Sequence, residues 1–225
     1  MIIMIRERGE KGTQQARRVL NVVAAGVLLI ASAPIMLVIA LAIRLTSSDP
    51  VLFTQLRVGV DRRGDRPAGS LAHRRSVDYG GRLFRIYKFR TMTHPRKQET
   101  RQCWAKPDDP RITPLGRILR KSRLDELPQL LNVLKGEMNL VGPRPEQPEI
   151  FRELRMEIPE YQVRQRVLPG ITGWAQVNLH YDQSIADVRQ KVALDLEYIH
   201  QQSAMEDLKI MFRTVPVMLF QKGSM

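Results

Sequence analysis

The feature that most constrains this chain is an uncharged, almost wholly apolar run of 25 residues, Val19 to Ile43. At about 1.5 Å per residue, a straight helix of this length spans roughly 37 Å, more than the hydrocarbon core of about 30 Å. The run is too long for an ordinary signal-peptide core, and no small-residue cleavage site with a polar mature start follows it. We therefore expect a membrane segment at 19–43, preceded by a basic N-terminal segment at 1–18.

The path of this segment through the membrane has two interpretations. Pro34 lies near its middle and removes a backbone donor, which predicts a kink, and Ser32 can bond a carbonyl that the kink frees. Arginines flank both ends, at Arg18 and Arg44, so the positive-inside rule gives no single orientation. A re-entrant helix-break-helix, entering and leaving on the same face, and a spanning helix with a proline kink both fit these residues.

Composition excludes several classes of protein. The 225 residues are 43% apolar, which is too little for a polytopic membrane protein and too much for a disordered chain. The single cysteine, Cys103, excludes an internal disulfide framework and a cysteine-based zinc site. Lys and Arg number 36 against 23 Asp and Glu, a net charge of +13. Such a charge suits nucleic acid, an anionic membrane face or phosphate-bearing substrates.

More than half of this charge excess lies just after the apolar run. Between Arg57 and Arg90 there are ten Lys or Arg and three Asp, a net of +7. We interpret 57–81 as an exposed basic loop, and its place next to the membrane segment favours contact with anionic lipid headgroups over a plain solvated loop. Aromatic residues are only 6% of the chain and sparse here, so the sequence argues against nucleic acid as a partner.

The remainder, 44–225, reads as one α+β domain that is mainly helical. Two alternating segments, Val51–Leu56 and Leu83–Phe89, predict a short β-hairpin with a long loop. The last helix, 203–220, has an apolar stripe and a proline at Pro216 that should interrupt it, and it lies either in the core or flat on the membrane interface. The other helices are expected at 114–121, at 128–136, at 148–158 and from Ser184 to about Ile199.

Two adjacent carboxylates, Asp125 and Glu126, are the sharpest candidates for chemistry. They stand directly before a helix expected to begin at Pro128, where free N–H groups favour negative charge, and the ordinary role of an Asp there is a cap. Arg120 and its basic neighbours supply a positive field suited to phosphate. Paired carboxylates also suit Mg²⁺ with substrate oxygens completing its ligands, and one could act as a nucleophile on phosphorus.

Two further motifs present cations in fixed directions. Pro143 and Pro145 restrain the backbone on both sides of Arg144, which suits a phosphate or carboxylate contact, although a plain rigid loop is an equal alternative. Lys88 and Arg90 share one side of a strand end, which alone is a weak signal. The segment 168–178 reads as a structural turn, and the four histidines show no metal-ligand spacing.

Taken in order, these motifs resemble the bacterial sugar transferase family, the small monotopic phosphoglycosyl transferases. The resemblance covers nearly the whole chain, and the joint occurrence of its motifs is specific. It is carried by the apolar run, the Phe53-x-Gln55-x-Arg57-x-Gly59 pattern, KFRTM (88–92), LDELPQ (124–129) and GPRPE (142–146), PGITGWAQVN (169–178) and the pattern from Asp207 to Thr214.

The resemblance implies transfer of sugar-1-phosphate from a UDP-sugar to polyprenyl (undecaprenyl) phosphate, with release of UMP. It implies Asp125 as covalent nucleophile and Mg²⁺ ligand, Glu126 as its catalytic support, and Arg120 and Arg144 as phosphate contacts. Lys88, Arg90 and the prolines at 143 and 145 then belong to the substrate-binding set. The expected place is the cytoplasmic face of a bacterial inner membrane, at the first membrane step of exopolysaccharide or other surface glycan synthesis. Domain 44–225 becomes the catalytic domain, and an acceptor held at the headgroups favours the re-entrant path.

Three departures from the family pattern mark this chain. Ala33 precedes Pro34 where serine is usual, the connection at 61–81 is longer than usual, and Leu179-His180 replaces the Gly-Arg common in members that use acetamido sugars. The last departure favours a hexose-1-phosphate donor. Two alternatives stay open: a direct ternary-complex transfer, and a non-enzymatic membrane-tethered basic scaffold. The sequence also leaves open the sugar, the polyprenyl length, the glycan pathway, the role of 61–81, and whether the chain is a monomer or a homodimer.

Overall fold

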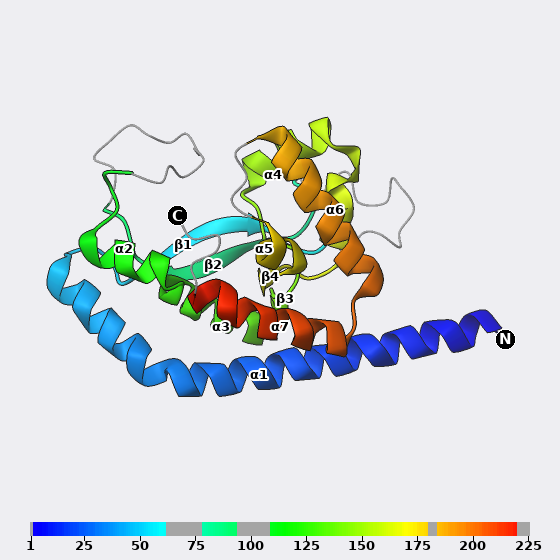
Figure 1. Ribbon diagram of the computed structural model, residues 1–225, viewed down its shortest axis with the longest axis horizontal. Helices are drawn as coiled ribbons and strands as arrows, with labels where there is room; N and C mark the ends of the chain where they lie inside the picture. The colour runs from blue at the N-terminus through cyan, green and yellow to red at the C-terminus, as the bar shows by residue number, and fades with distance from the viewer. Residues whose placement is uncertain (1, 62–77, 94–108, 180–183, 220–225) are drawn as a thin grey trace.

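A long N-terminal helix lies along one side of the molecule, and the remaining elements stack above it (Figure 1). This computed structural model describes residues 2–61, 78–93, 109–179 and 184–219. Most of the basic loop predicted at 57–81 therefore lies outside the described residues. In chain order the elements are α1 (Ile2–Thr46), β1 (Leu52–Val58), β2 (Leu83–Phe89), α2 (Pro114–Lys121), the 3₁₀ helix η1 (Leu124–Gln129), α3 (Leu130–Leu134), β3 (Asn139–Val141), α4 (Pro148–Glu157), the 3₁₀ helix η2 (Pro159–Arg166), β4 (Gly170–Thr172), α5 (Trp174–Asn178), α6 (Ile185–Gln201) and α7 (Ala204–Leu219).

Helix α1 corrects the predicted helix-break-helix. It is helical without interruption through Pro34, and the ribbon bends in its second half (Figure 1). One proline removes a single backbone hydrogen bond, so the turns on both sides can continue and the helix bends instead of ending. The Ser32 hydroxyl donates to the carbonyl of Leu29 at 3.3 Å, inside this continuous helix. Within the described residues, Gln14–Thr46 of α1 is the segment long and apolar enough to cross a membrane.

The predicted β-hairpin is confirmed. Strands β1 and β2 pair antiparallel, with Leu52 opposite Phe89 and Val58 opposite Leu83. Alternate residues of β2 point inward: Phe84 and Ile86 are 6% and 4% exposed. This alternation is the period-2 signal on which the prediction rested.

A second strand pair was not predicted. β3 and β4 pair in parallel, Asn139 opposite Gly170 and Val141 opposite Thr172. Each strand has only three residues, too few for an alternating pattern to stand out. The pairing matters because it places the segment after β3 beside the segment around β4.

The helix boundaries follow capping chemistry. The Thr113 hydroxyl accepts from the Gly116 N–H and begins α2, and Ser184 forms a capping box with Asp187 at the start of α6. Helix α7 runs through Pro216 to Leu219, so the predicted interruption there is wrong.

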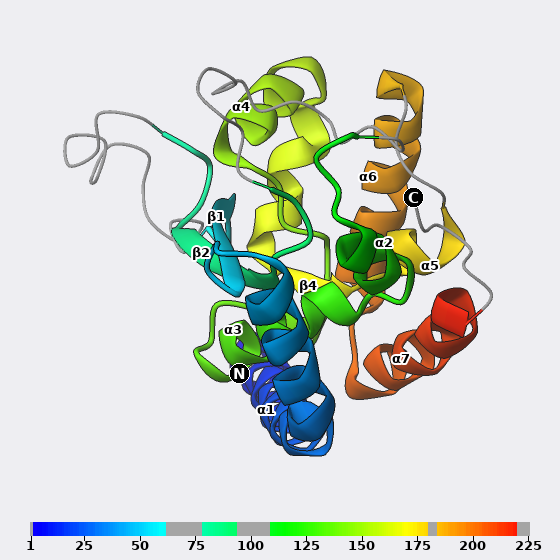
Figure 2. The same ribbon diagram turned by 90° about the vertical axis from the view of Figure 1, so that its left-hand side faces the viewer.

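Helix α1 packs on the folded domain at two separate places. Near its middle, Ala25 is fully buried in the same core cluster as Phe84 and Ile86. Near its end, Ile39 and Ile43 pack in a second cluster with Phe89 and Leu119 of the hairpin and α2. Between them, residues 26–38 contain no buried residue. Figure 2 shows α1 below the domain with its second limb turned towards α2.

Candidate active site

The two carboxylates lie in the short 3₁₀ helix η1. The sequence placed them before a helix beginning at Pro128, whereas Pro128 lies inside η1 and α3 begins at Leu130. The chain enters η1 through Arg123, whose φ of 58° is left-handed and turns the backbone after α2. In a 3₁₀ helix residues three apart share a face. Asp125 and Glu126 are therefore on different faces, although both are buried, at 8% and 7% exposed.

Glu126 forms ion pairs with two cations from distant parts of the chain. Lys88 of β2 donates to its Oε1 at 2.7 Å, and Arg144, after β3, donates to the same oxygen at 2.8 Å. The second Arg144 nitrogen lies 3.5 Å from Oε2. The structure thus joins three of the residues predicted for the site, Lys88, Glu126 and Arg144, and Asp125 lies next to Glu126 in η1.

The surroundings separate the pKa values of the two carboxyl groups. Burial raises the pKa of Glu126, but the charges and hydrogen bonds of Arg144 and Lys88 outweigh it and hold that pKa well below its usual range. Burial also raises the pKa of Asp125, and the neighbouring charge of Glu126 adds to the rise. Lys88, Arg144 and Arg120 lower it without cancelling the effect of burial. Glu126 is therefore the carboxylate that the cations neutralise.

The remaining two predicted cations take different places. Arg120, at the end of α2, acts through its charge on Asp125. Arg90 follows β2, and its side chain donates to the carbonyl of Pro50 at 2.7 Å and pairs with Asp49 at 3.7 Å. These contacts hold the α1–β1 connection, and they do not bring Arg90 to the carboxylates.

The loop that carries Arg144 packs backbone-to-backbone against the segment around β4. The Gly142 N–H donates to the Thr172 carbonyl at 2.9 Å, and the Gly170 N–H donates to the Pro143 carbonyl at 3.0 Å. A Cβ on Gly170 would stand 2.1 Å from the Gly142 nitrogen. The segment interpreted as a structural turn therefore supports the site. The glycines of this segment were the sequence signal that could have indicated such close backbone packing.

The residues present fit a magnesium site built on one carboxylate. Asp125 makes no side-chain hydrogen bond or ion pair within the part of the chain that the structure describes. Over the same residues there is no group of three or more His, Cys, Asp or Glu side chains that could hold a metal alone. Mg²⁺ commonly takes one or two carboxylates and completes its ligands with substrate phosphates and water. Asp125 suits that arrangement, whereas Glu126 is occupied by its cations.

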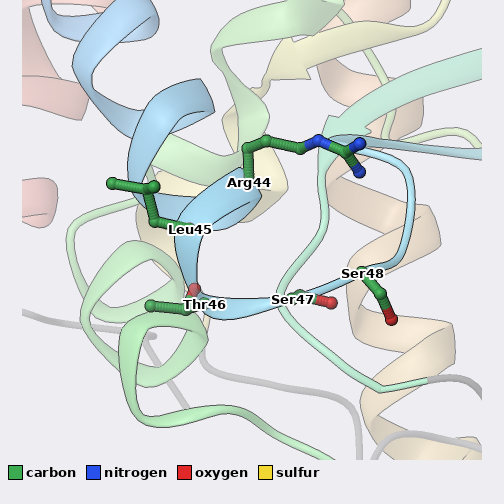
Figure 3. Close-up of a pocket in the computed structure, with 5 residues that line it drawn as sticks. All are labelled: Arg44, Leu45, Thr46, Ser47 and Ser48. Carbon is green, nitrogen blue, oxygen red and sulfur yellow. The ribbon is translucent and has the colours of Figure 1, made fainter.

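An open hollow of about 530 Å³ lies at the end of α1 (Figure 3). It is lined by Arg44, Leu45, Thr46, Ser47 and Ser48. None of these is among the carboxylates or cations described above, so the hollow is a feature of the α1–β1 connection.

Comparison with known proteins identifies relatives of this chain. The sequence model of the family described as bacterial sugar transferase matches residues 12–221. A UDP-glucose:undecaprenyl-phosphate glucose-1-phosphate transferase of Caulobacter vibrioides is 43% identical over 205 residues, 90% of this chain and 69% of that protein. A UDP-N-acetylgalactosamine-undecaprenyl-phosphate N-acetylgalactosaminephosphotransferase of Aeromonas hydrophila is 40% identical over 92% of this chain and 44% of its own length. The uncharacterized sugar transferase EpsL of Bacillus subtilis is 37% identical over 92% of this chain and 89% of its own.

Proposed function

The chain belongs to the bacterial sugar transferase family and is a phosphoglycosyl transferase, and on this basis we propose that it moves sugar-1-phosphate from a UDP-sugar to undecaprenyl phosphate, releasing UMP. The observation that carries the proposal is the difference in bonding between Asp125 and Glu126, the two carboxylates of η1. Glu126 is bonded by Lys88 and Arg144, and Asp125 beside it has no hydrogen-bonded partner within the described residues. This leaves one carboxylate available to react in a field of positive charge.

The proposed reaction has two displacements at one phosphorus. In the first, a carboxylate oxygen of Asp125 attacks the phosphorus that carries the sugar, the bond from that phosphorus to the bridging oxygen breaks, and UMP leaves with that oxygen. In the second, a phosphate oxygen of undecaprenyl phosphate attacks the same phosphorus. The bond to Asp125 breaks, and the carboxylate is regenerated. A ping-pong sequence of this kind lets a soluble donor and a lipid acceptor use one site in turn.

Each residue of the site has a part in this proposal. Arg144 and Lys88 fix the Glu126 side chain next to the nucleophile, where the acceptor phosphate would be activated. Together with Arg120 they place positive charge where phosphate oxygens gather negative charge in the transition state. Asp125 would hold Mg²⁺ together with diphosphate oxygens, and the metal would supply charge neutralisation of the leaving phosphate.

The packing of α1 supports a re-entrant path through one leaflet. The side proposed, the cytoplasmic face of the inner membrane, follows from the family resemblance and not from this packing. Arg17, before the apolar run, pairs with Asp207 of α7 at 3.0 Å. Ile43, at the end of the run, packs with Leu119 of α2 in the same domain. A helix that crossed the bilayer would put these two contacts on opposite sides. The apolar, unburied stretch between them, 26–38, is the part that membrane lipids would surround.

The donor proposed is a UDP-hexose. The proposal rests on Leu179-His180, where many members that use acetamido sugars have Gly-Arg; His180 lies outside the described residues. The names of the Caulobacter and Aeromonas relatives point to different sugars, glucose and N-acetylgalactosamine. A screen of UDP-sugars read out by UMP release decides between them.

UMP release with purified protein, undecaprenyl phosphate and Mg²⁺ tests the function. The native chain should release UMP only when Mg²⁺ is present, and Asp125→Asn should lose activity by about 10³-fold or more, as removal of a covalent nucleophile does. Asp187→Asn is the matched control, because the Asp187 carboxylate accepts from the Ser184 N–H in the capping box of α6, away from the carboxylates of η1. Retained activity in Asp125→Asn would overturn the role given to that residue. A native chain that binds anionic lipid but releases no UMP with any UDP-sugar would favour the scaffold alternative.

A further inference from the structure

The loop that carries Arg144 is anchored to the rest of the protein through its backbone carbonyl groups. Over residues 143–146 each carbonyl accepts a hydrogen bond from a different donor, and these donors come from three separate elements. In chain order, the donors are Gly170 N at 3.0 Å, Arg164 Nη2 at 3.0 Å, Arg57 Nη1 at 3.1 Å and Val58 N at 2.9 Å. Two of the four loop residues are prolines, which have no N–H with which to anchor the loop themselves. The position of Arg144 therefore depends on the hydrogen bonds that the carbonyls of residues 143–146 accept.

The donor to Arg144 itself is a buried arginine that the reaction does not use. Arg164 of η2 is 1% exposed, and its Nε donates to Asp195 of α6 at 2.7 Å. Its guanidinium also lies over the ring of Tyr161, 4.7 Å from the centroid. A charged side chain is costly to bury, so such a group is retained where its hydrogen bonds serve something specific. Among the residues that the structure describes, the one backbone oxygen that Arg164 binds belongs to Arg144, which donates to Glu126.

We propose that Arg164, oriented by Asp195, is a positioning residue for the transfer reaction, because it fixes the main chain of Arg144 and so the contact between Arg144 and Glu126. The planar guanidinium serves two acceptors at once in a fixed geometry: the carboxylate of Asp195 through Nε and the Arg144 carbonyl through Nη2. A connected path then leads from α6 through η2 to the reacting carboxylates. This inference rests on the proposed function for its effect on rate, but the positioning itself does not.

A double-mutant cycle on kcat/KM for UMP release tests the path. Arg164→Lys keeps the positive charge but loses the planar guanidinium that donates to two acceptors at once. It should lower kcat/KM about 10- to 100-fold, the range for a displaced positioning group. In an Arg144→Ala background the same change should cost about twofold or less, because the group it positions is gone. Equal losses in the two backgrounds would overturn the proposal and make Arg164 a general stabilising residue.

The matched control is a second buried arginine with the same chemistry. Arg17 pairs with Asp207 at 3.0 Å but makes no bond to residues 143–146. Arg17→Lys should therefore change kcat/KM by the same factor whether Arg144 is present or not. If Arg164→Lys does not fold, Asp195→Asn enters the cycle in its place, since it keeps every atom of Arg164 and loosens only its orientation.

Hydrogen exchange followed by mass spectrometry tests the positioning without using activity. Arg164→Lys should speed exchange in the peptide that covers residues 139–147 and leave α1 unchanged, whereas unchanged exchange in that peptide would overturn the proposal. The two failures are distinguishable: a native chain that releases no UMP contradicts the proposed function, and an unaltered loop in the variant contradicts the positioning.

Discussion

At the scale of single residues, Asp125 and Glu126 differ in what surrounds them more than in their chemistry. Burial tends to raise the pKa of both carboxyl groups, but only Glu126 is bonded by Arg144 and Lys88, which reverse the effect. Two neighbouring groups with pKa values pushed apart are typical of sites where one carboxylate reacts and the other supports it. Sequence spacing could nominate the pair, but only the fold shows which member is neutralised.

A glycine prediction tests how tightly the Arg144 loop is packed. Gly170→Ala would set a Cβ 2.1 Å from the Gly142 nitrogen, so one backbone segment must move. We expect a loss of stability of about 2 kcal/mol or more and at least about a tenfold loss of kcat/KM. Gly26→Ala is the control, because a Cβ there meets nothing within 4 Å. Thermal unfolding and UMP release measure both, and equal behaviour of the two variants would contradict the packing argument.

Glu146 gives a prediction for pH. Burial raises its pKa, but Lys191, Arg164 and Arg57 lower it to about 2 from an ordinary 4.5. A group with a lowered folded-state pKa stabilises the protein above the unfolded pKa and loses that contribution as pH falls. We therefore expect about 3 kcal/mol of the free energy of unfolding to disappear between about pH 4.5 and pH 2. Denaturant unfolding of Glu146→Gln should show a shallower fall over this range, and parallel curves for variant and native chain would contradict it.

At the scale of elements, the prolines show what could be predicted from the sequence. Pro114 and Pro148 begin α2 and α4 as expected, because the first turn of a helix leaves its N–H groups unpaired in any case. Pro34, Pro128 and Pro216 all lie inside helices, where the outcome depends on whether packed neighbours keep the adjacent turns together. The starts at Pro114 and Pro148 were predictable because a helix start is a local event. Pro128 was also expected to begin a helix but lies inside η1, and the fate of such an interior proline depends on tertiary packing.

The residues of the site also divide into those that could be predicted from the sequence and those that could not. Asp125, Glu126, Lys88 and Arg144 were nominated because their residue types and neighbours carry a chemical signal. The support for the loop came from a three-residue parallel pairing and from the buried pair of Arg164 and Asp195, which no local pattern marks. Such contacts join residues far apart in sequence, so one sequence alone could not reveal them.

The path of α1 is tested by accessibility at its two ends. In a Cys103→Ser background, single cysteines at Gln14 and Ser47 should both resist an impermeant maleimide in intact spheroplasts, and both should react after permeabilisation. The reason is that Arg17 and Ile43, close to these positions, contact one and the same domain. Labelling of one position but not the other in intact spheroplasts would show a spanning helix and contradict the re-entrant proposal.

At the scale of the whole molecule, the net charge of +13 serves more than one purpose. Lys88 and Arg144 lie next to the reacting carboxylates. Arg57 and Arg164 donate hydrogen bonds to backbone carbonyls of the Arg144 loop. Arg17 pairs with Asp207 and so joins α1 to α7. The apolar residues are divided in the same way, between a compact core and the unburied stretch of α1. We interpret the molecule as a phosphate-handling site held at the membrane surface by one bent helix.

Trapping the first half-reaction tests the central claim most directly. The purified chain is incubated with Mg²⁺ and the UDP-sugar that the UMP-release screen selects, without undecaprenyl phosphate, then digested and analysed by mass spectrometry. We predict that the peptide containing Asp125 gains the mass of one sugar phosphate, that Asp125→Asn gains none, and that undecaprenyl phosphate removes the adduct. Turnover that requires both substrates together, with no adduct on Asp125 at any time, would contradict the covalent mechanism and establish direct transfer.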